Sequence, residues 1–177
     1  MLDTLRRSRA LKAAHQAVAS RRAFPPEARV DARRVFAVLP EAQDIDDDVQ
    51  RDAWHFLAGL DLPPRQIVPV VFGRDVGAPD RFAGSVLHIG EKSIDWRGLP
   101  RTAVTEALWT QRPDVAIDLS TEFSVAAAYL VGGSPAAIRI GLDPSPEAAP
   151  FYDLVVTGET EGLRRALEQL DPRVLPV

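Results

Sequence analysis

The stretch that decides the fold is DVAIDL at residues 114–119, followed by a run of small residues and then by IRIG at residues 138–141. Both are short segments of mainly apolar residues, which is typical of strands buried in a sheet. The helix between them is expected to begin near Thr121, to pass through the alanines at 126–128 and to end at the glycine pair 132–133. This segment therefore predicts a strand, a helix and a second strand that lies parallel to the first.

The same alternation continues in both directions along the chain. Apolar runs predict further strands at residues 34–40, 67–72, 86–89 and 152–156. Helical spacing predicts helices at residues 2–24, 49–60, 102–110 and 163–170. Alternating strands and helices predict an α/β fold, a three-layer and mostly parallel open sheet of the Rossmann-like or flavodoxin-like kind. Pro69 lacks an N–H group and disfavours a central place for the strand that contains it.

Composition limits the class of protein. The chain has 177 residues, of which 46% are hydrophobic, and this is enough for one globular domain with a real core. It has no cysteine, which excludes disulfides and thiolate metal sites and fits a cytoplasmic location. No apolar run is long enough to predict a transmembrane segment, and the first residues do not resemble a secretory signal.

Charge is unevenly distributed along the chain. Residues 1–34 contain nine Lys or Arg and three Asp or Glu, whereas the rest contains twelve and twenty-two. We therefore expect residues 1–26 to form a basic helical arm and residues 27–177 to form a single α/β domain. The cations predicted to contact a partner are Arg6, Arg7, Arg9 and Lys12. That partner is expected to be a protein or an anionic surface, with RNA and the membrane surface as alternatives, or the arm clamps onto its own domain.

Polar residues follow three of the predicted strands, at the edge of the sheet where open α/β proteins bind ligands. The candidate ligand-binding residues are Asp44, Asp46, Ser120, Thr121 and Thr157. The acidic loop could hold a cation or supply a base, or it could simply place negative charge at a helix start. The hydroxyls could bind a phosphate or a carboxylate, or they could serve as helix caps.

Established catalytic motifs are absent from the sequence. It contains neither G-x-G-x-x-G nor G-x-x-x-x-G-K-[ST], so a standard nucleotide site is not predicted. It also lacks G-x-S-x-G, the nucleophile motif of α/β-hydrolases. Its three histidines, His15, His55 and His88, are far apart and show no metal-ligand spacing. No catalytic residue, cofactor or metal is therefore predicted.

Two resemblances rest on these segments. Residues 114–119 and 138–141 resemble the acceptor-side, N-terminal half of heptosyltransferase-type GT-B glycosyltransferases, although the Gly-Asp turn and the donor-binding half of that family are missing. Together with the DWRGLP element at 95–100 and the basic N-terminal helix, they resemble more closely an uncharacterised family of short α/β proteins from Bacteroidota and relatives. The closer resemblance implies a three-layer α/β fold and no particular activity.

Two functions remain open from the sequence. The first is a non-catalytic binding or adaptor protein whose basic helix contacts a partner or an anionic surface. The alternative is an enzyme, or the relict of a glycosyltransferase-like half-domain, that binds a sugar or a phosphorylated small molecule at the carboxyl ends of the strands. An open pocket at those ends favours the alternative.

Overall fold

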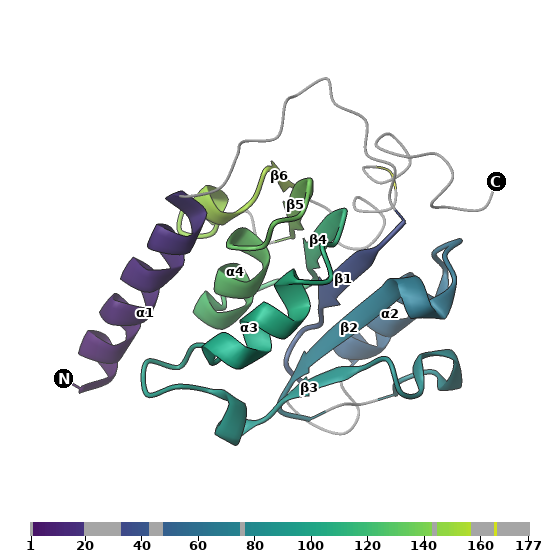
Figure 1. Cartoon of the computed structure of the whole chain (residues 1–177), viewed down its shortest axis with the longest axis horizontal. Coiled ribbons are helices and arrows are strands. Elements are labelled where there is room, and N and C mark those ends of the chain that lie inside the picture. The colour runs from purple at the N-terminus through teal and green to yellow at the C-terminus, as the bar shows by residue number, and fades with distance from the viewer. Residues whose placement is uncertain are drawn as a thin grey trace.

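A single parallel sheet forms the centre of the molecule (Figure 1). The computed structural model describes residues 2–19, 33–42, 48–74, 77–142, 145–156 and 165. The strands are β1 (Val35–Val38), β2 (Ile67–Phe72), β3 (Leu87–Ile89), β4 (Val115–Asp118), β5 (Ile138–Gly141) and β6 (Leu154–Val155). Their order is β3-β2-β1-β4-β5-β6, and every pairing is parallel. The predicted α/β class with an open parallel sheet is confirmed.

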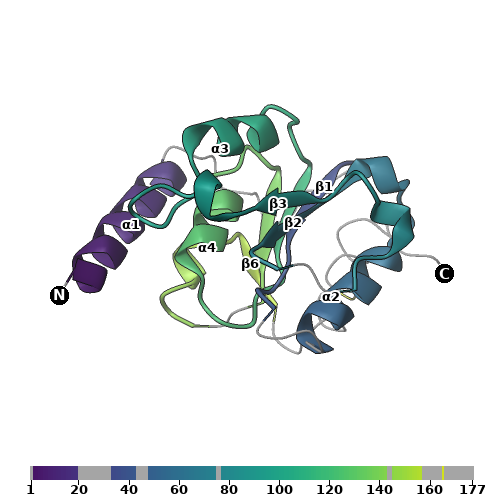
Figure 2. The same ribbon diagram turned by 90° about the horizontal axis from the view of Figure 1, so that it is seen from below.

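Helices cover both faces of this sheet, as Figure 2 shows. Helix α2 (Asp48–Ala58) lies on one face, and α3 (Thr102–Trp109) and α4 (Val125–Gly132) lie on the other. Helix α1 (Leu2–Ala19) lies outside α4. Short 3₁₀ turns, η1 to η4, occupy Pro64–Gln66, Asp80–Phe82, Glu91–Ser93 and Ala149–Phe151. The helix predicted at 163–170 lies outside the described residues, apart from residue 165.

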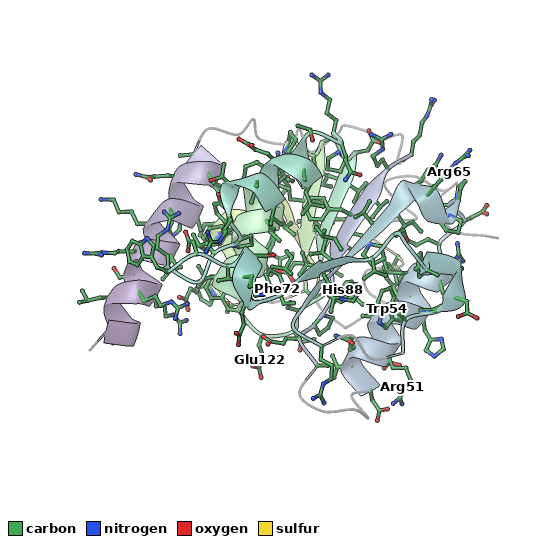
Figure 3. All side chains as sticks on the ribbon, turned by 60° about the horizontal axis from the view of Figure 1, so that its bottom comes forward. Arg51, Trp54, Arg65, Phe72, His88 and Glu122 are labelled. Carbon is green, nitrogen blue, oxygen red and sulfur yellow. The ribbon has the colours of Figure 1, made fainter. Side chains whose placement is uncertain are left out.

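The core is divided between the two faces because successive strand residues point to opposite sides. In β1, Val35 and Ala37 pack toward α2, whereas Phe36 and Val38 pack toward α3 and α4. All four are buried, which explains why the strand reads as a continuous apolar run. Trp54 of α2, labelled in Figure 3, is fully buried on the first face, and its ring centroid lies 5.6 Å from that of Phe82.

Pro69 does not exclude β2 from the interior of the sheet, so that expectation was wrong. Strand β2 pairs with β1 on one side and with β3 on the other. The carbonyl of Val70 accepts from the N–H of Leu39, so the backbone hydrogen-bonding groups of Val70 point toward β1. Those of the preceding residue, Pro69, therefore point toward β3. The pairing with β3 begins only at Val70 and Leu87. The missing N–H of Pro69 therefore falls just before the β3 ladder starts.

A buried ion pair ties β5 to the start of β6. Nη1 of Arg139 lies 2.8 Å from Oδ2 of Asp153, and the two side chains are 3% and 7% exposed. The same carboxylate oxygen accepts from the backbone N–H of Arg139 at 3.0 Å. The carbonyl of Ser134 accepts from Nε and Nη2 of Arg139 at 3.1 and 2.8 Å. These partners compensate the guanidinium for the water it has lost.

Helix α1 packs against the domain in this structure. Ala10 and Ala14 are buried, and Leu11 and Val18 are partly buried, with Ala14 in the same apolar cluster as α4. Small side chains allow close approach, and the Cβ of Ala17 would lie 2.9 Å from a Cβ placed on Gly133. The division into an arm at 1–26 and a domain at 27–177 stays a prediction that a docking variant can test.

Replacing Ala14 by glutamate is expected to release α1 from α4. Ala14 is fully buried, and a carboxylate at that position would lose its water without gaining a partner. The helix carries several trypsin-sensitive cations, so the variant should be cleaved within residues 2–19 much faster than the wild type. Gln16→Glu, at an exposed position of the same helix, adds the same charge and should leave the cleavage rate unchanged. Equal cleavage rates in both variants would show that Ala14 does not hold the helix.

Candidate functional site

A cleft of about 960 Å³ opens at the carboxyl ends of the first four strands. Its walls come from the residues that follow β1, β2 and β3, from the turn between β4 and α4, and from helix α1. Chain segments far apart in the sequence therefore meet at one edge of the sheet. We call this feature the switch-point cleft, because the strand order reverses at this edge of the sheet.

The location of the cleft follows from the strand order. From β1 the chain builds outward through β2 to β3, and then crosses back to place β4 on the other side of β1. The chain leaves β1 toward α2 on one face and leaves β4 toward α4 on the other face, so these two connections diverge at the neighbouring carboxyl ends of β1 and β4. Open α/β sheets bind their ligands at this reversal of strand order.

The turn between β4 and α4 forms one wall. Ser120 and Thr121, which the sequence singled out, both line the cleft. The predicted helix start near Thr121 was wrong, because α4 begins at Val125 and its cap is Ser124. The Ser124 hydroxyl accepts from the N–H of Ala127 at 3.3 Å. Ser120 and Thr121 are therefore turn residues in the wall of the cleft, and capping does not explain them.

The side chain of Asp118 stabilises this turn. Asp118 ends β4, is 2% exposed, and its Oδ1 accepts from the N–H of Ser120 at 3.0 Å. Its Oδ2 accepts from the hydroxyl of Tyr152 at 2.5 Å. A buried carboxylate with two such partners fixes the backbone that carries Ser120.

The opposite wall is tied together by Gln50 of α2, which is fully buried. Its Nε2 donates to the carbonyl of Pro40 after β1 at 2.8 Å and to that of Arg74 after β2 at 3.3 Å. The sequence reasoning missed this residue. The available signal was a polar side chain at helical spacing from Ala53, Trp54 and Leu57, on the apolar stripe of the helix.

Helix α1 contributes Arg6 to the cleft. The Arg6 guanidinium lies about 3.6 Å from the position of a Cβ on Gly98. Arg7 bonds both carboxylate oxygens of Glu147 at 3.2 Å, and the Arg9 guanidinium lies 5.2 Å from the Trp96 ring centroid. Lys12 is exposed. Of the four cations predicted to bind a partner, three thus contact or face their own domain.

The loop that receives α1 is held in shape by Asp95. Its Oδ1 accepts from the backbone N–H groups of Arg97 and Leu99 at 2.8 and 3.1 Å, and Oδ2 accepts from Nε of Arg97 at 2.8 Å. Burial by itself raises the pKa of Asp95, but the hydrogen bonds from Arg97 and Leu99 favour the charged form and bring the pKa below its ordinary 3.8.

Asparagine at position 95 should therefore make stability less dependent on pH. A lowered pKa in the folded state stabilises the protein above the unfolded-state pKa, and this contribution disappears as the pH falls through the folded-state value. We expect Asp95→Asn to be less stable than the wild type at neutral pH, with the gap closing as the pH drops below about 4. Urea unfolding across this range measures the gap. A gap that stays constant with pH would contradict the assignment.

Three of the predicted ligand-binding residues, Asp44, Asp46 and Thr157, are not among those that the structure describes. Within the described part of the chain, no group of three or more His, Cys, Asp or Glu side chains is arranged to hold a metal ion. Among the same residues, no helix is both long and apolar enough to cross a membrane.

The strand order and the cleft define the class, an α/β protein with a doubly wound parallel sheet and a cleft at its topological switch point. A comparison with protein-family models finds no match, and comparisons with curated proteins and with solved structures find none either.

Proposed function

We propose that this protein binds a small polar molecule in the switch-point cleft. The observation that carries the proposal is the cleft of about 960 Å³ at the carboxyl ends of the strands on both sides of the β1 and β4 boundary. Ligand sites have volumes of roughly 300–1,000 Å³ and combine apolar walls with a few polar groups. The lining here offers both, with Phe72 and Phe123 beside Ser120 and Thr121.

The described lining residues favour binding over nucleophilic catalysis. A serine or threonine hydroxyl is a weak nucleophile until an adjacent base, most often a histidine, removes its proton. No histidine is among the described residues that line the cleft, and no hydrogen bond among them joins the Ser120 or Thr121 hydroxyl to a lining carboxylate. The enzyme alternative would use this same cleft, and a turnover assay on an identified ligand separates the two functions.

An adaptor role for the basic helix, the first expectation from the sequence, has less support. Arg7 pairs with Glu147, the Arg9 guanidinium lies over the Trp96 ring, and Arg6 lines the cleft. An outside partner would have to displace these contacts before it could bind those cations. The cytoplasmic location proposed from the sequence is compatible with either role.

A thermal-shift screen of metabolite-like compounds tests the proposal. A compound at ten times its Kd stabilises the folded state by about 1.4 kcal/mol, which raises the Tm of a domain of this size by roughly 3–5 °C. Ala126→Phe places an aromatic ring in the wall of the cleft and should abolish the shift.

Ala103→Phe provides the matched control, because Ala103 is exposed on α3 and does not line the cleft. This variant should retain the full shift. A compound that stabilises both variants equally binds elsewhere, and that outcome would contradict the proposal.

A further inference from the structure

We infer that the switch-point cleft selects a hydroxylated small molecule that is neutral or positively charged, and that it discriminates against phosphorylated ones. This inference rests on the proposed function and specifies the class of ligand. It depends on the ionisable and hydrogen-bonding groups that line the cleft.

Negative charge predominates in the lining. The ionisable side chains among the described lining residues are Glu41, Glu91, Glu122 and Arg6. The first turn of α4 also faces the cleft, and a helix N-terminus acts as about half a positive charge. Three carboxylates against one guanidinium and this half charge leave a net charge of roughly −1.5.

The three carboxylates belong to three separate chain segments that line the cleft. Glu41 follows β1, Glu91 follows β3, and Glu122 lies in the turn after β4. Figure 3 shows Glu122 at the edge of the molecule. A ligand that fills the cleft cannot avoid all three, because they belong to separate segments of the wall. A single local ion pair with Arg6 therefore cannot neutralise the site.

The hydrogen-bonding groups point to the same class of ligand. Ionised carboxylates only accept hydrogen bonds, so their partners must be donors such as hydroxyl or ammonium groups. Ser120 and Thr121 can donate or accept and thus suit hydroxyl groups. Phe72, labelled in Figure 3, and Phe123 offer apolar surface to the carbon skeleton of the ligand. A phosphate brings acceptors only, and it would face a wall rich in acceptors.

The expected selectivity is modest because the carboxylates are exposed. A net charge of about −1.5 at about 7 Å, in water and at physiological ionic strength, changes affinity by about twofold per unit of ligand charge. An ammonium and a phosphate differ by about three units of charge. We therefore expect a difference in affinity of roughly five- to tenfold between otherwise matched ligands.

Glucosamine, glucose and glucose 6-phosphate provide a matched set of probes, because they share a sugar skeleton and differ mainly in charge. Their Kd values for the full chain are to be measured by NMR titration at a pH where the amine is protonated. The inference predicts the tightest binding for glucosamine, weaker binding for glucose and the weakest for glucose 6-phosphate. Tightest binding of glucose 6-phosphate would overturn the inference and leave the proposed function standing.

If none of the three sugars binds while other compounds bind in the cleft, the hydroxylated class is wrong and the proposed function survives. If nothing binds in the cleft at all, both are wrong. The two failures are therefore distinguishable.

Single charge changes test the electrostatic origin of the selectivity. Glu122→Gln should lower the ratio of glucosamine to glucose 6-phosphate affinity by about threefold, and Arg6→Gln should raise it by a similar factor. Glu106→Gln removes the same charge from an exposed position on α3 that does not line the cleft, and should leave the ratio unchanged. Raising the salt concentration to about 1 M should bring the ratio close to one. A ratio that responds neither to salt nor to Glu122→Gln and Arg6→Gln would show that charge does not select the ligand.

Discussion

Replacing Asp153 by alanine is expected to lower the free energy of unfolding by about 3–5 kcal/mol. The substitution leaves the Arg139 guanidinium buried beside β5 with the Ser134 carbonyl and without its counter-ion. It also removes the acceptor of the Arg139 backbone N–H. Removing one partner of a buried pair costs far more than the pair contributes, because the remaining charge stays out of water. Urea unfolding of the variant measures the loss.

The exposed pair between Arg7 and Glu147 is the natural control. These side chains are 59% and 43% exposed, so Glu147→Ala should cost no more than about 1 kcal/mol. The double variant Arg139→Met with Asp153→Leu should be more stable than Asp153→Ala alone, since it leaves no buried charge. Equal losses from Asp153→Ala and Glu147→Ala would contradict the view that burial makes the inner pair important.

The second large effect is expected from Gly141→Ala, at the end of β5. A Cβ at this position would lie 2.4 Å from two ring atoms of Tyr152, well inside van der Waals contact. The ring is buried, and its hydroxyl is held by Asp118 at 2.5 Å, so it cannot move aside without breaking that hydrogen bond. We expect a loss of about 3 kcal/mol or more in the free energy of unfolding.

Gly90→Ala tests the steric origin of that loss. A Cβ on Gly90 meets nothing within 4 Å, and its backbone is extended, so alanine should change stability by less than about 0.5 kcal/mol. In a Tyr152→Leu background, Gly141→Ala should cost much less than in the wild type, because the obstructing ring is gone. A cost that is the same in both backgrounds would show that the ring is not the obstacle.

Local sequence patterns predicted the fold well because the sheet is parallel and buried. Strands β4 and β5 are mainly apolar, and all of their residues are buried, including Asp118 and Arg139. The expectation that Pro69 keeps its strand out of the interior of the sheet was wrong. A proline shows which backbone hydrogen bond is missing, but it does not show whether the neighbouring strand extends as far as that residue. The start of α4 was predicted too early because serine and threonine favour both turns and helix caps. In the structure, Ser120 and Thr121 lie in the turn, whereas Ser124 is the cap.

The site was only partly predictable. Ser120 and Thr121 follow a strand that was identified, so the general rule for strand ends located them correctly. Arg6 and Glu91 could not be assigned to the cleft, since their positions depend on how α1 and the segment after β3 fold back over the sheet. From its charge, Arg6 was predicted to contact a partner. The packing of α1 on α4 brings it to the cleft instead.

The most direct test of ligand binding in the switch-point cleft is chemical-shift mapping on the full, isotope-labelled chain. Compounds that raise the Tm would be titrated while the backbone amide signals are followed. We predict that the largest changes occur at Gly73, Gly90 and Thr121, which follow three different strands and all line the cleft. Changes confined to another surface, or no stabilising compound at all, would contradict the proposal that this cleft is the functional site.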